Sequence, residues 1–164
     1  MRFTVDQRFP APPDAVARAF ADPDLYAAFQ DLPKMSRPEV LAHAVQGDEV
    51  ALEVRYRFTG DLSPAARAVL DPARLTWVEH ATHDLGARTT TFQMVPDHYA
   101  DRFRCSGLYR FEEDGSRDRT RRHGEAEIKV RAPLVGGAVE RAIVSGLREH
   151  LDAEVAVVEA FLAR

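Results

Sequence analysis

Cysteine is nearly absent from this chain of 164 residues, which contains Cys105 alone. A single cysteine excludes a disulfide within the chain, and we interpret it as a small buried residue. Long apolar runs are absent as well, since none approaches the roughly 20 residues that cross a bilayer. Residues 1–6 alternate like a strand and lack the apolar core of a signal peptide. These absences predict a reduced, cytoplasmic protein without an integral membrane segment.

A strong excess of either charge is also missing. The net charge of −4 and the pI of about 5.9 provide no general attraction to nucleic acid or to acidic membranes. One basic run stands out, containing Arg117, Arg119, Arg121, Arg122 and His123. On a strand, Arg119, Arg121 and His123 would share an outer face with acidic neighbours such as Glu112, and no aromatic side chains are interleaved for stacking. We therefore expect a solvated face and no nucleic-acid partner.

The chain is rich in segments with alternating polar and apolar residues. Apolar residues make up 45% of it and charged residues 29%, as in a globular protein. The alternation predicts strands at 2–9, 39–45, 50–58, 75–81, 89–95, 102–111 and 120–130. Two short helices are predicted after the first strand, with Pro13 and Pro23 in their first turns and Asp22 as the N-cap of the second. The short connections between later strands indicate an antiparallel meander in a single domain, residues 1–164.

A long amphipathic helix is predicted at 134–163. Its apolar positions recur at spacings of four, with one of three: Val135, Val139, Ile143, Leu147, Leu151, Val155, Val158 and Leu162. Arg141, Ser145, Arg148, Asp152 and Glu159 occupy the opposite face. A helix of this length needs a broad surface, so we expect an α+β fold. In this fold, a curved seven-stranded antiparallel sheet wraps around the C-terminal helix.

Small residues are concentrated in the first half of this helix, namely Gly136, Gly137, Ala138, Ala142 and Gly146. Glycine inside a helix costs about 1 kcal/mol relative to alanine, so helix propensity does not explain Gly146. Two interpretations stay open. The small residues either allow close packing of a bulky residue from the sheet or leave room for a ligand between helix and sheet.

The order of elements resembles the START-like (SRPBCC), helix-grip superfamily, which includes birch-pollen allergens, lipid-transfer START domains and polyketide cyclases. The resemblance is carried by Phe3-Thr4-Val5, by the strand-to-helix corner from Phe9-Pro10-Ala11-Pro12-Pro13 to Val16, and by Ala19-Phe20-Ala21-Asp22-Pro23. The sequence is also similar to an actinobacterial branch of unknown function within this superfamily. The resemblance covers essentially the whole chain and implies a fold and a ligand cavity, but it carries over no catalytic signature.

Several polar residues are predicted to face the interior. The period of two directs Glu79 and His83 inward with Trp77, and Gln7, Cys105, Tyr109, Thr120 and Arg122 inward on other strands. A buried carboxylate without a partner is very costly, so we expect Glu79 to be paired, protonated, near the cavity mouth or displaced by a bulge. Arg122 is the candidate partner, unless both residues lie where strands reach solvent. His80 and His83 fall on opposite faces, so we expect no metal site and no cofactor.

These residues define a candidate ligand site between the helix and the sheet. Its predicted ligand-binding residues are Tyr26, Phe29, Trp77, Glu79, Tyr109, Arg122, Ala142 and Gly146. The leading hypothesis is binding or transport of a hydrophobic small molecule, lipid-like or polyketide-like, without catalysis. One alternative is a cyclase- or hydrolase-like enzyme with Glu79 and His83 as acid/base candidates. Another is an interaction module with a filled core. The sequence assigns neither the ligand nor an oligomeric state.

Overall fold

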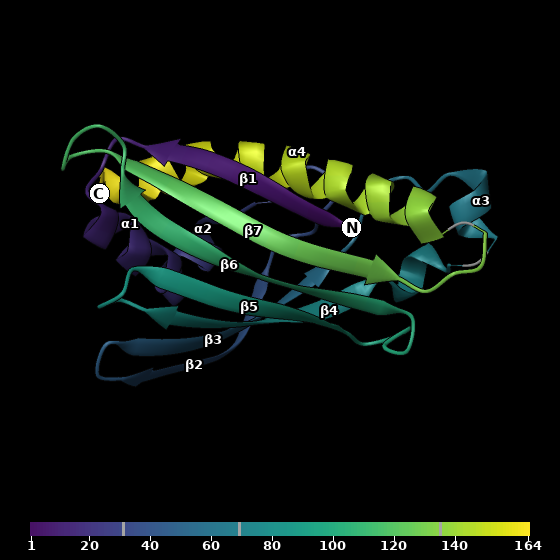
Figure 1. The fold of residues 1–164 in the computed structure, drawn as a ribbon. Helices are drawn as coiled ribbons and strands as arrows, with labels where there is room; N and C mark the ends of the chain where they lie inside the picture. The colour runs from purple at the N-terminus through teal and green to yellow at the C-terminus, as the bar shows by residue number, and fades with distance from the viewer. Residues whose placement is uncertain (31, 69, 135) are drawn as a thin grey trace.

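The fold consists of a curved sheet and a long helix that lies across its concave side. The computed structural model describes residues 1–30, 32–68, 70–134 and 136–164. The elements in chain order are β1 (Arg2–Phe9), α1 (Pro13–Phe20), α2 (Pro23–Ala28), β2 (Glu39–Gln46), β3 (Glu49–Arg57), α3 (Pro64–Arg67), a 3₁₀ turn (Pro72–Arg74), β4 (Thr76–Asp84), β5 (Thr89–Pro96), β6 (Phe103–Glu113), β7 (Thr120–Val130) and α4 (Gly136–Leu162). Figure 1 shows α4 running along the length of the sheet. The predicted helix-grip fold is confirmed.

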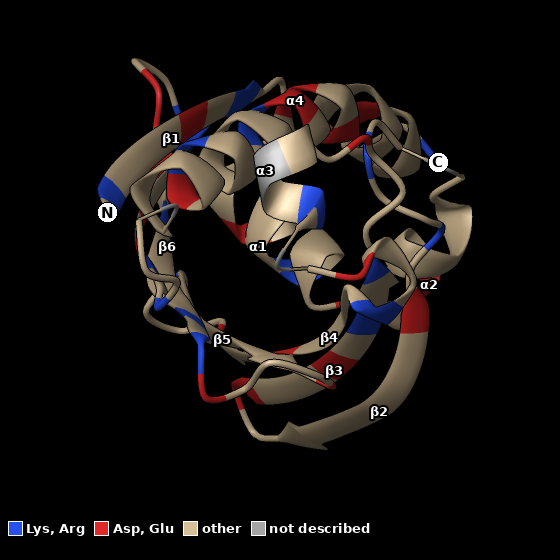
Figure 2. Ribbon diagram, turned by 90° about the vertical axis from the view of Figure 1, so that its right-hand side faces the viewer, with Lys and Arg blue, Asp and Glu red and all other residues tan. Residues whose placement is uncertain are grey.

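All neighbouring strands of the seven-stranded sheet are antiparallel, in the order β1-β7-β6-β5-β4-β3-β2. Strands β2 to β7 follow one another as a meander, whereas β1 pairs with β7 from the other end of the chain. Figure 2 shows the sheet as a wide arc, with α4 closing the open side and α1 and α2 within the same opening. Side chains on the concave face therefore meet those of the helices.

Two glycines allow aromatic rings to lie flat on the concave face. Gly107 is opposite Phe92 in the register, and Gly124 is opposite Tyr109. A Cβ atom on Gly107 would approach the Phe92 ring to 2.6 Å, and one on Gly124 would approach the Tyr109 ring to 2.5 Å. The absence of side chains at these positions lets the two rings stack, with centroids 5.2 Å apart.

The two helices after β1 begin where the prolines predict. Pro13 and Pro23 occupy the first turns, and the Asp22 side chain accepts a hydrogen bond of 2.9 Å from the backbone N–H of Asp24. Helix α2 ends at Ala28, earlier than the apolar pattern predicts, because Phe29 adopts an extended conformation with ψ of 135°. This turn in the chain leaves both Phe29 and Met35 buried.

Helix α4 uses the predicted apolar face. Leu147, Leu151 and Val158 are buried, Val155 is half-buried, and the predicted polar face is exposed. Val135 lies outside the described residues, and Leu134 precedes the helix with φ of 66°. Within the part of the chain that the structure describes, no helix is long and apolar enough to cross a membrane.

Candidate functional site

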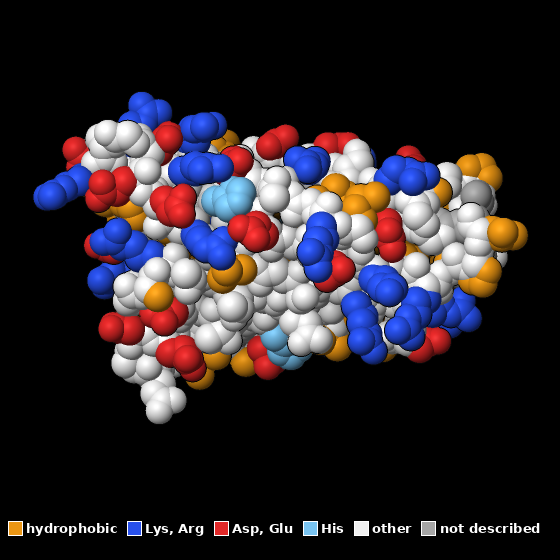
Figure 3. Space-filling view, in the orientation of Figure 1, with side chains coloured by type: hydrophobic (Ala, Val, Ile, Leu, Met, Phe, Trp, Pro, Cys, Tyr) orange, Lys and Arg blue, Asp and Glu red, His pale blue; other side chains and the backbone are white. Residues whose placement is uncertain are grey.

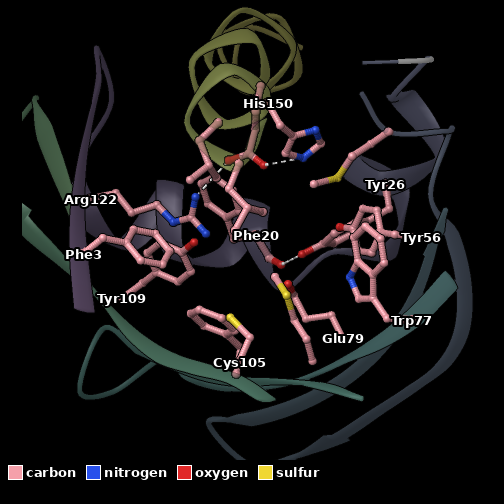
Figure 4. Close-up of a pocket in the computed structure, with 16 residues that line it drawn as sticks. Phe3, Phe20, Tyr26, Tyr56, Trp77, Glu79, Cys105, Tyr109, Arg122 and His150 are labelled. Atoms are coloured by element: carbon pink, nitrogen blue, oxygen red, sulfur yellow. Dashed lines mark hydrogen bonds and ion pairs between the residues drawn. The ribbon is translucent and has the colours of Figure 1, made fainter. Parts of the chain in front are cut away.

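A cavity of about 50 Å³ lies between α4 and the concave face of the sheet (Figure 4). Its wall combines aromatic, aliphatic and sulfur-containing side chains with two carboxylates, a guanidinium group and an imidazole, from Glu79, Glu154, Arg122 and His150. A volume of this size holds one or a few water molecules. Pockets for drug-sized ligands typically measure about 300–1,000 Å³. The cavity must therefore widen to admit a larger ligand.

Five of the eight predicted ligand-binding residues line this cavity: Tyr26, Trp77, Glu79, Tyr109 and Arg122. Phe29 does not line it, because it is buried beside Tyr26 in the core with ring centroids 6.1 Å apart. The prediction that Ala142 and Gly146 line the cavity is not supported, since neither belongs to its wall. The period of two on the strands was thus a better guide than the run of small residues on the helix.

The small residues in the first half of α4 do not face the cavity as predicted. Ala138 and Ala142 are exposed, so the expectation that they face Trp77 and Tyr109 is wrong. Each precedes a residue of the buried stripe by one position, which corresponds to a rotation of about 100° around the helix. A Cβ atom on Gly146 would lie 3.4 Å from Cδ of Lys34, and one on Gly136 would lie 2.7 Å from the carbonyl oxygen of Val130. At Gly136 the structure supports close packing, against the backbone of β7. Gly146 contacts Lys34, which lies in a turn outside the sheet, at an ordinary contact distance, so a bulky residue from the sheet does not explain this glycine.

Arg122 is the centre of a buried polar network. Its Nη1 donates hydrogen bonds to Oε1 of Glu154 at 2.8 Å and to Oε1 of Gln7 at 2.6 Å. Its guanidinium group lies 3.8 Å from the ring centroid of Phe20 and 3.6 Å from that of Tyr109. Gln7 also donates hydrogen bonds to Glu154 and to the backbone carbonyl of Leu151. The network links β1, β7 and α4 and holds Arg122 between two rings, a favourable cation–π geometry.

Sequence reasoning missed two cavity residues on α4, His150 and Glu154. A signal for them exists in the helix spacing. Glu154 follows Leu151 by three positions and precedes Val158 by four, while His150 follows Leu147 by three, so both fall within the apolar stripe. Nε2 of His150 lies 3.9 Å from Oε2 of Glu154. Burial lowers the pKa of His150, which favours the neutral ring.

Glu79 faces the same cavity but does not take part in this network. The prediction that Arg122 pairs with Glu79 is wrong, because Glu154 occupies the guanidinium group. Among the described residues, no hydrogen-bond donor satisfies the Glu79 carboxylate. Burial raises its pKa to about 7, against the opposing effect of the Arg122 charge. The cavity thus contains a half-buried carboxyl group whose pKa lies well above its ordinary value.

Other buried polar atoms on the cavity wall also lack partners within the described chain. They are Nε1 of Trp77, Nδ1 of His150 and Nε of Arg122. Buried polar groups in folded proteins almost always have a hydrogen-bond partner, so each of these atoms calls for an explanation. A bound water or a polar group of a ligand would provide one.

The proposed acid/base pair of Glu79 and His83 is not assembled. His83 is buried away from the cavity wall and shares a 2.8 Å hydrogen bond with Oγ1 of Thr90. Burial lowers its pKa to about 4. His80 projects from the other face of β4, where it lies 3.2 Å from Glu53. Across the described residues, no group of three or more His, Cys, Asp or Glu side chains could hold a metal ion.

The outer face of β1, β7 and β6 carries interspersed charges of both signs (Figure 3). Asp6 lies 2.7 Å from Arg121 and 2.8 Å from His123, and these interactions lower the pKa of its carboxyl group. Arg121 and His123 of the basic run thus have an acidic partner on the outer face, as the solvated-face interpretation predicts, whereas Arg122 of the same run is buried.

Solved structures with similar folds span nearly the whole chain. The protein TTHA0849 from Thermus thermophilus is 17% identical with a TM-score of 0.69, covering 99% of this chain and 97% of that protein. The Zhui aromatase/cyclase from Streptomyces sp. R1128 is 16% identical with a TM-score of 0.68, covering 100% and 94%. Norcoclaurine synthase from Thalictrum flavum is 15% identical with a TM-score of 0.67, covering 100% and 87%. At these identities the likeness concerns the fold alone.

No curated protein sequence matches the chain. The narrower assignment to an actinobacterial branch stays a prediction. A family match, in contrast, extends over residues 4–162. The chain therefore belongs to the family described as "Protein of unknown function (DUF2505)".

Proposed function

We propose that this protein binds a small, mostly apolar molecule with one polar end in the cavity between α4 and the sheet. The observation that carries the proposal is a mostly apolar wall that presents two buried N–H or ring-nitrogen atoms without partners among the described residues, Trp77 Nε1 and His150 Nδ1, together with the half-buried carboxyl group of Glu79. A few polar groups on an apolar wall are the usual means of orienting a small ligand. Helix-grip neighbours that include an aromatase/cyclase and norcoclaurine synthase are consistent with such a role.

A ligand can enter the cavity only if side chains in its wall move and enlarge it. Met35 and Met94 both line the cavity, and methionine side chains have three rotatable bonds that adapt readily to irregular shapes. Rotation of these side chains would enlarge the space without moving a strand. The ligand class is accordingly narrower than a lipid or a polyketide chain, and a single-ring compound is the appropriate probe.

Catalysis is the alternative function, and one observation favours it. A carboxyl group with a pKa of about 7 is well suited to accept and return a proton at neutral pH. Glu79 would then be the acid/base group, without the predicted partnership of His83.

The location of the protein in the cytoplasm stays a prediction.

Trp77 provides a direct test because it is the one tryptophan of the chain and lines the cavity. Benzyl alcohol titrated into the protein should change the Trp77 emission saturably, and calorimetry should give the same affinity. Cys105 is a buried wall residue, so Cys105→Leu should fill the cavity and abolish binding, whereas Cys105→Ala should retain it. A folded protein with no saturable response to any of several single-ring probes would refute the binding function and favour the interaction module.

A further inference from the structure

The charges around the cavity do not balance. Arg122 and Glu154 form a 2.8 Å ion pair whose side chains are 8% and 10% exposed, so they neutralise each other. Glu79 adds a carboxylate for which the described residues supply no ion-pair partner. A buried charge is costly unless it is paired. When Glu79 is ionised, the cavity lacks one positive charge.

Arg122 cannot turn to Glu79 without loss. It would have to abandon its hydrogen bonds to Gln7 and Glu154, and its guanidinium group lies between the rings of Phe20 and Tyr109. In Figure 4, Arg122 and Tyr109 lie on one side of the cavity, while Trp77 and Tyr56 lie on the other. No described residue supplies the missing positive charge, so Glu79 either binds a proton or is paired by a cation from the ligand.

Aromatic side chains line the same cavity as Glu79. Tyr56 is directly opposite Trp77 in the register, and their rings stack with centroids 5.8 Å apart and an interplanar angle of 18°. Glu79 follows Trp77 by two residues on the same face of β4, a distance of about 7 Å. The Tyr26 hydroxyl donates a 3.0 Å hydrogen bond to the carbonyl oxygen of Phe20. A carboxylate beside electron-rich rings is the combination that recognises an ammonium group.

We propose that the ligand carries a protonated amine on a small apolar body, with the ammonium group at Glu79 and beside the Tyr56–Trp77 pair. This inference rests on the proposed binding function and adds the chemical class of the ligand. The N–H at Nε of Arg122 has no partner among the described residues, so it can donate a hydrogen bond to a second polar group of the ligand. An anionic ligand that binds there instead is the competing outcome of the test.

The pH dependence of binding should identify Glu79. The ionisable groups that face it are Tyr26 from α2, Tyr56 from β3, Cys105 and Tyr109 from β6, Arg122 from β7, and His150 and Glu154 from α4. Burial raises the pKa of the three tyrosines and of the cysteine, so these four groups stay neutral between pH 6 and pH 8. Burial lowers the pKa of His150, which favours its neutral ring. Glu154 is held against Arg122. With a pKa of about 7, Glu79 passes through its ionisation in this interval.

A matched series of probes tests the inference through Trp77 emission and calorimetry. The series is benzylamine, benzyl alcohol and benzoate, which share a ring and differ in charge. We expect benzylamine to bind at least about tenfold more tightly than benzyl alcohol at pH 8, and benzoate to bind most weakly. The affinity for benzylamine should rise roughly tenfold from pH 6 to pH 8, following the ionised fraction of Glu79.

Two variants distinguish a specific effect of the Glu79 carboxylate on amine binding from an effect of the protein's overall charge. Glu79→Gln should abolish both the preference for benzylamine and its pH dependence, so that benzylamine and benzyl alcohol bind with similar affinities. Glu53→Gln removes the same charge from the outer face of the neighbouring strand, where Glu53 pairs with His80, and should behave like the parent protein. Circular dichroism confirms that each variant is folded.

The outcomes distinguish the inference from the function on which it depends. If benzyl alcohol binds but benzylamine has no advantage, or if benzoate binds best, the amine proposal is wrong and the binding function stands. If Glu79→Gln leaves the benzylamine preference unchanged, the amine does not bind at Glu79 and the proposal is again overturned. If no probe binds at all, the proposed function itself fails.

Discussion

The ion pair between Arg122 and Glu154 should be among the most sensitive positions in the core. Both side chains are about nine-tenths buried, and the pair joins β7 to α4. Glu154→Leu would leave the guanidinium group buried with Gln7 as its remaining hydrogen-bond acceptor among the described residues. Removing one partner of a buried pair typically costs about 3–5 kcal/mol. Because Gln7 and two aromatic rings still contact Arg122, we expect Glu154→Leu to lower the free energy of unfolding by about 3 kcal/mol, the lower end of this range.

The free energy of unfolding can be measured by urea denaturation at pH 8, supported by thermal melting. For a chain of this size, 3 kcal/mol corresponds to a decrease in melting temperature of roughly 6–12 °C. Glu159→Leu is the matched control, since Glu159 is exposed on the same helix and should change stability by less than about 0.5 kcal/mol. Replacing both partners, Arg122→Met with Glu154→Leu, should restore much of the loss, because an apolar pair leaves no buried charge.

Two results would refute this reasoning. One is a Glu154→Leu variant as stable as the Glu159→Leu control, which would mean that the pair is not buried in solution. The other is a double variant whose loss equals the sum of the two single losses, since independent residues add whereas paired ones do not.

Three further predictions concern stability and access to the cavity. Glu79→Gln should raise the unfolding free energy by up to about 3 kcal/mol at pH 8 and leave it unchanged below about pH 4.5, because a pKa raised from the ordinary 4.5 to about 7 in the folded state destabilises that state as pH rises. A pH-independent effect in urea titrations would contradict this. Leu151→Ala should lower the free energy of unfolding by about 2–5 kcal/mol, because Leu151 is buried. The control Asp152→Ala changes an exposed residue and should lower it by less than about 0.5 kcal/mol. Equal losses in the two variants would mean that the buried face of the helix is misassigned. Cys105, buried with a pKa of about 12, should react with a disulfide reagent far more slowly than the unfolded chain, and saturating benzyl alcohol should slow it further; unchanged rates would show that the probe binds elsewhere.

Much of the fold and part of the site follow from local patterns in the sequence. Trp77, Glu79, Tyr109 and Arg122 were assigned to the interior from the period of two, because side-chain direction along a strand depends only on position parity. The starts of the short helices follow from proline geometry and from the Asp22 cap, which are contacts between near neighbours in the chain. Helix α4 follows from its long apolar repeat in the same way.

The tertiary structure decided which of these residues interact. The rotation of α4 about its axis depends on packing against the whole sheet, so the small residues that suggested a pocket face solvent at Ala142 and Lys34 at Gly146. The choice of Glu154 over Glu79 as the partner of Arg122 brings together residues 32 positions apart on different elements. The small volume of the cavity likewise depends on how side chains from the helix and the sheet fill the shared space. Spacing along the chain specifies where each side chain points on its own element, but only the assembled layers bring these side chains within contact distance of one another.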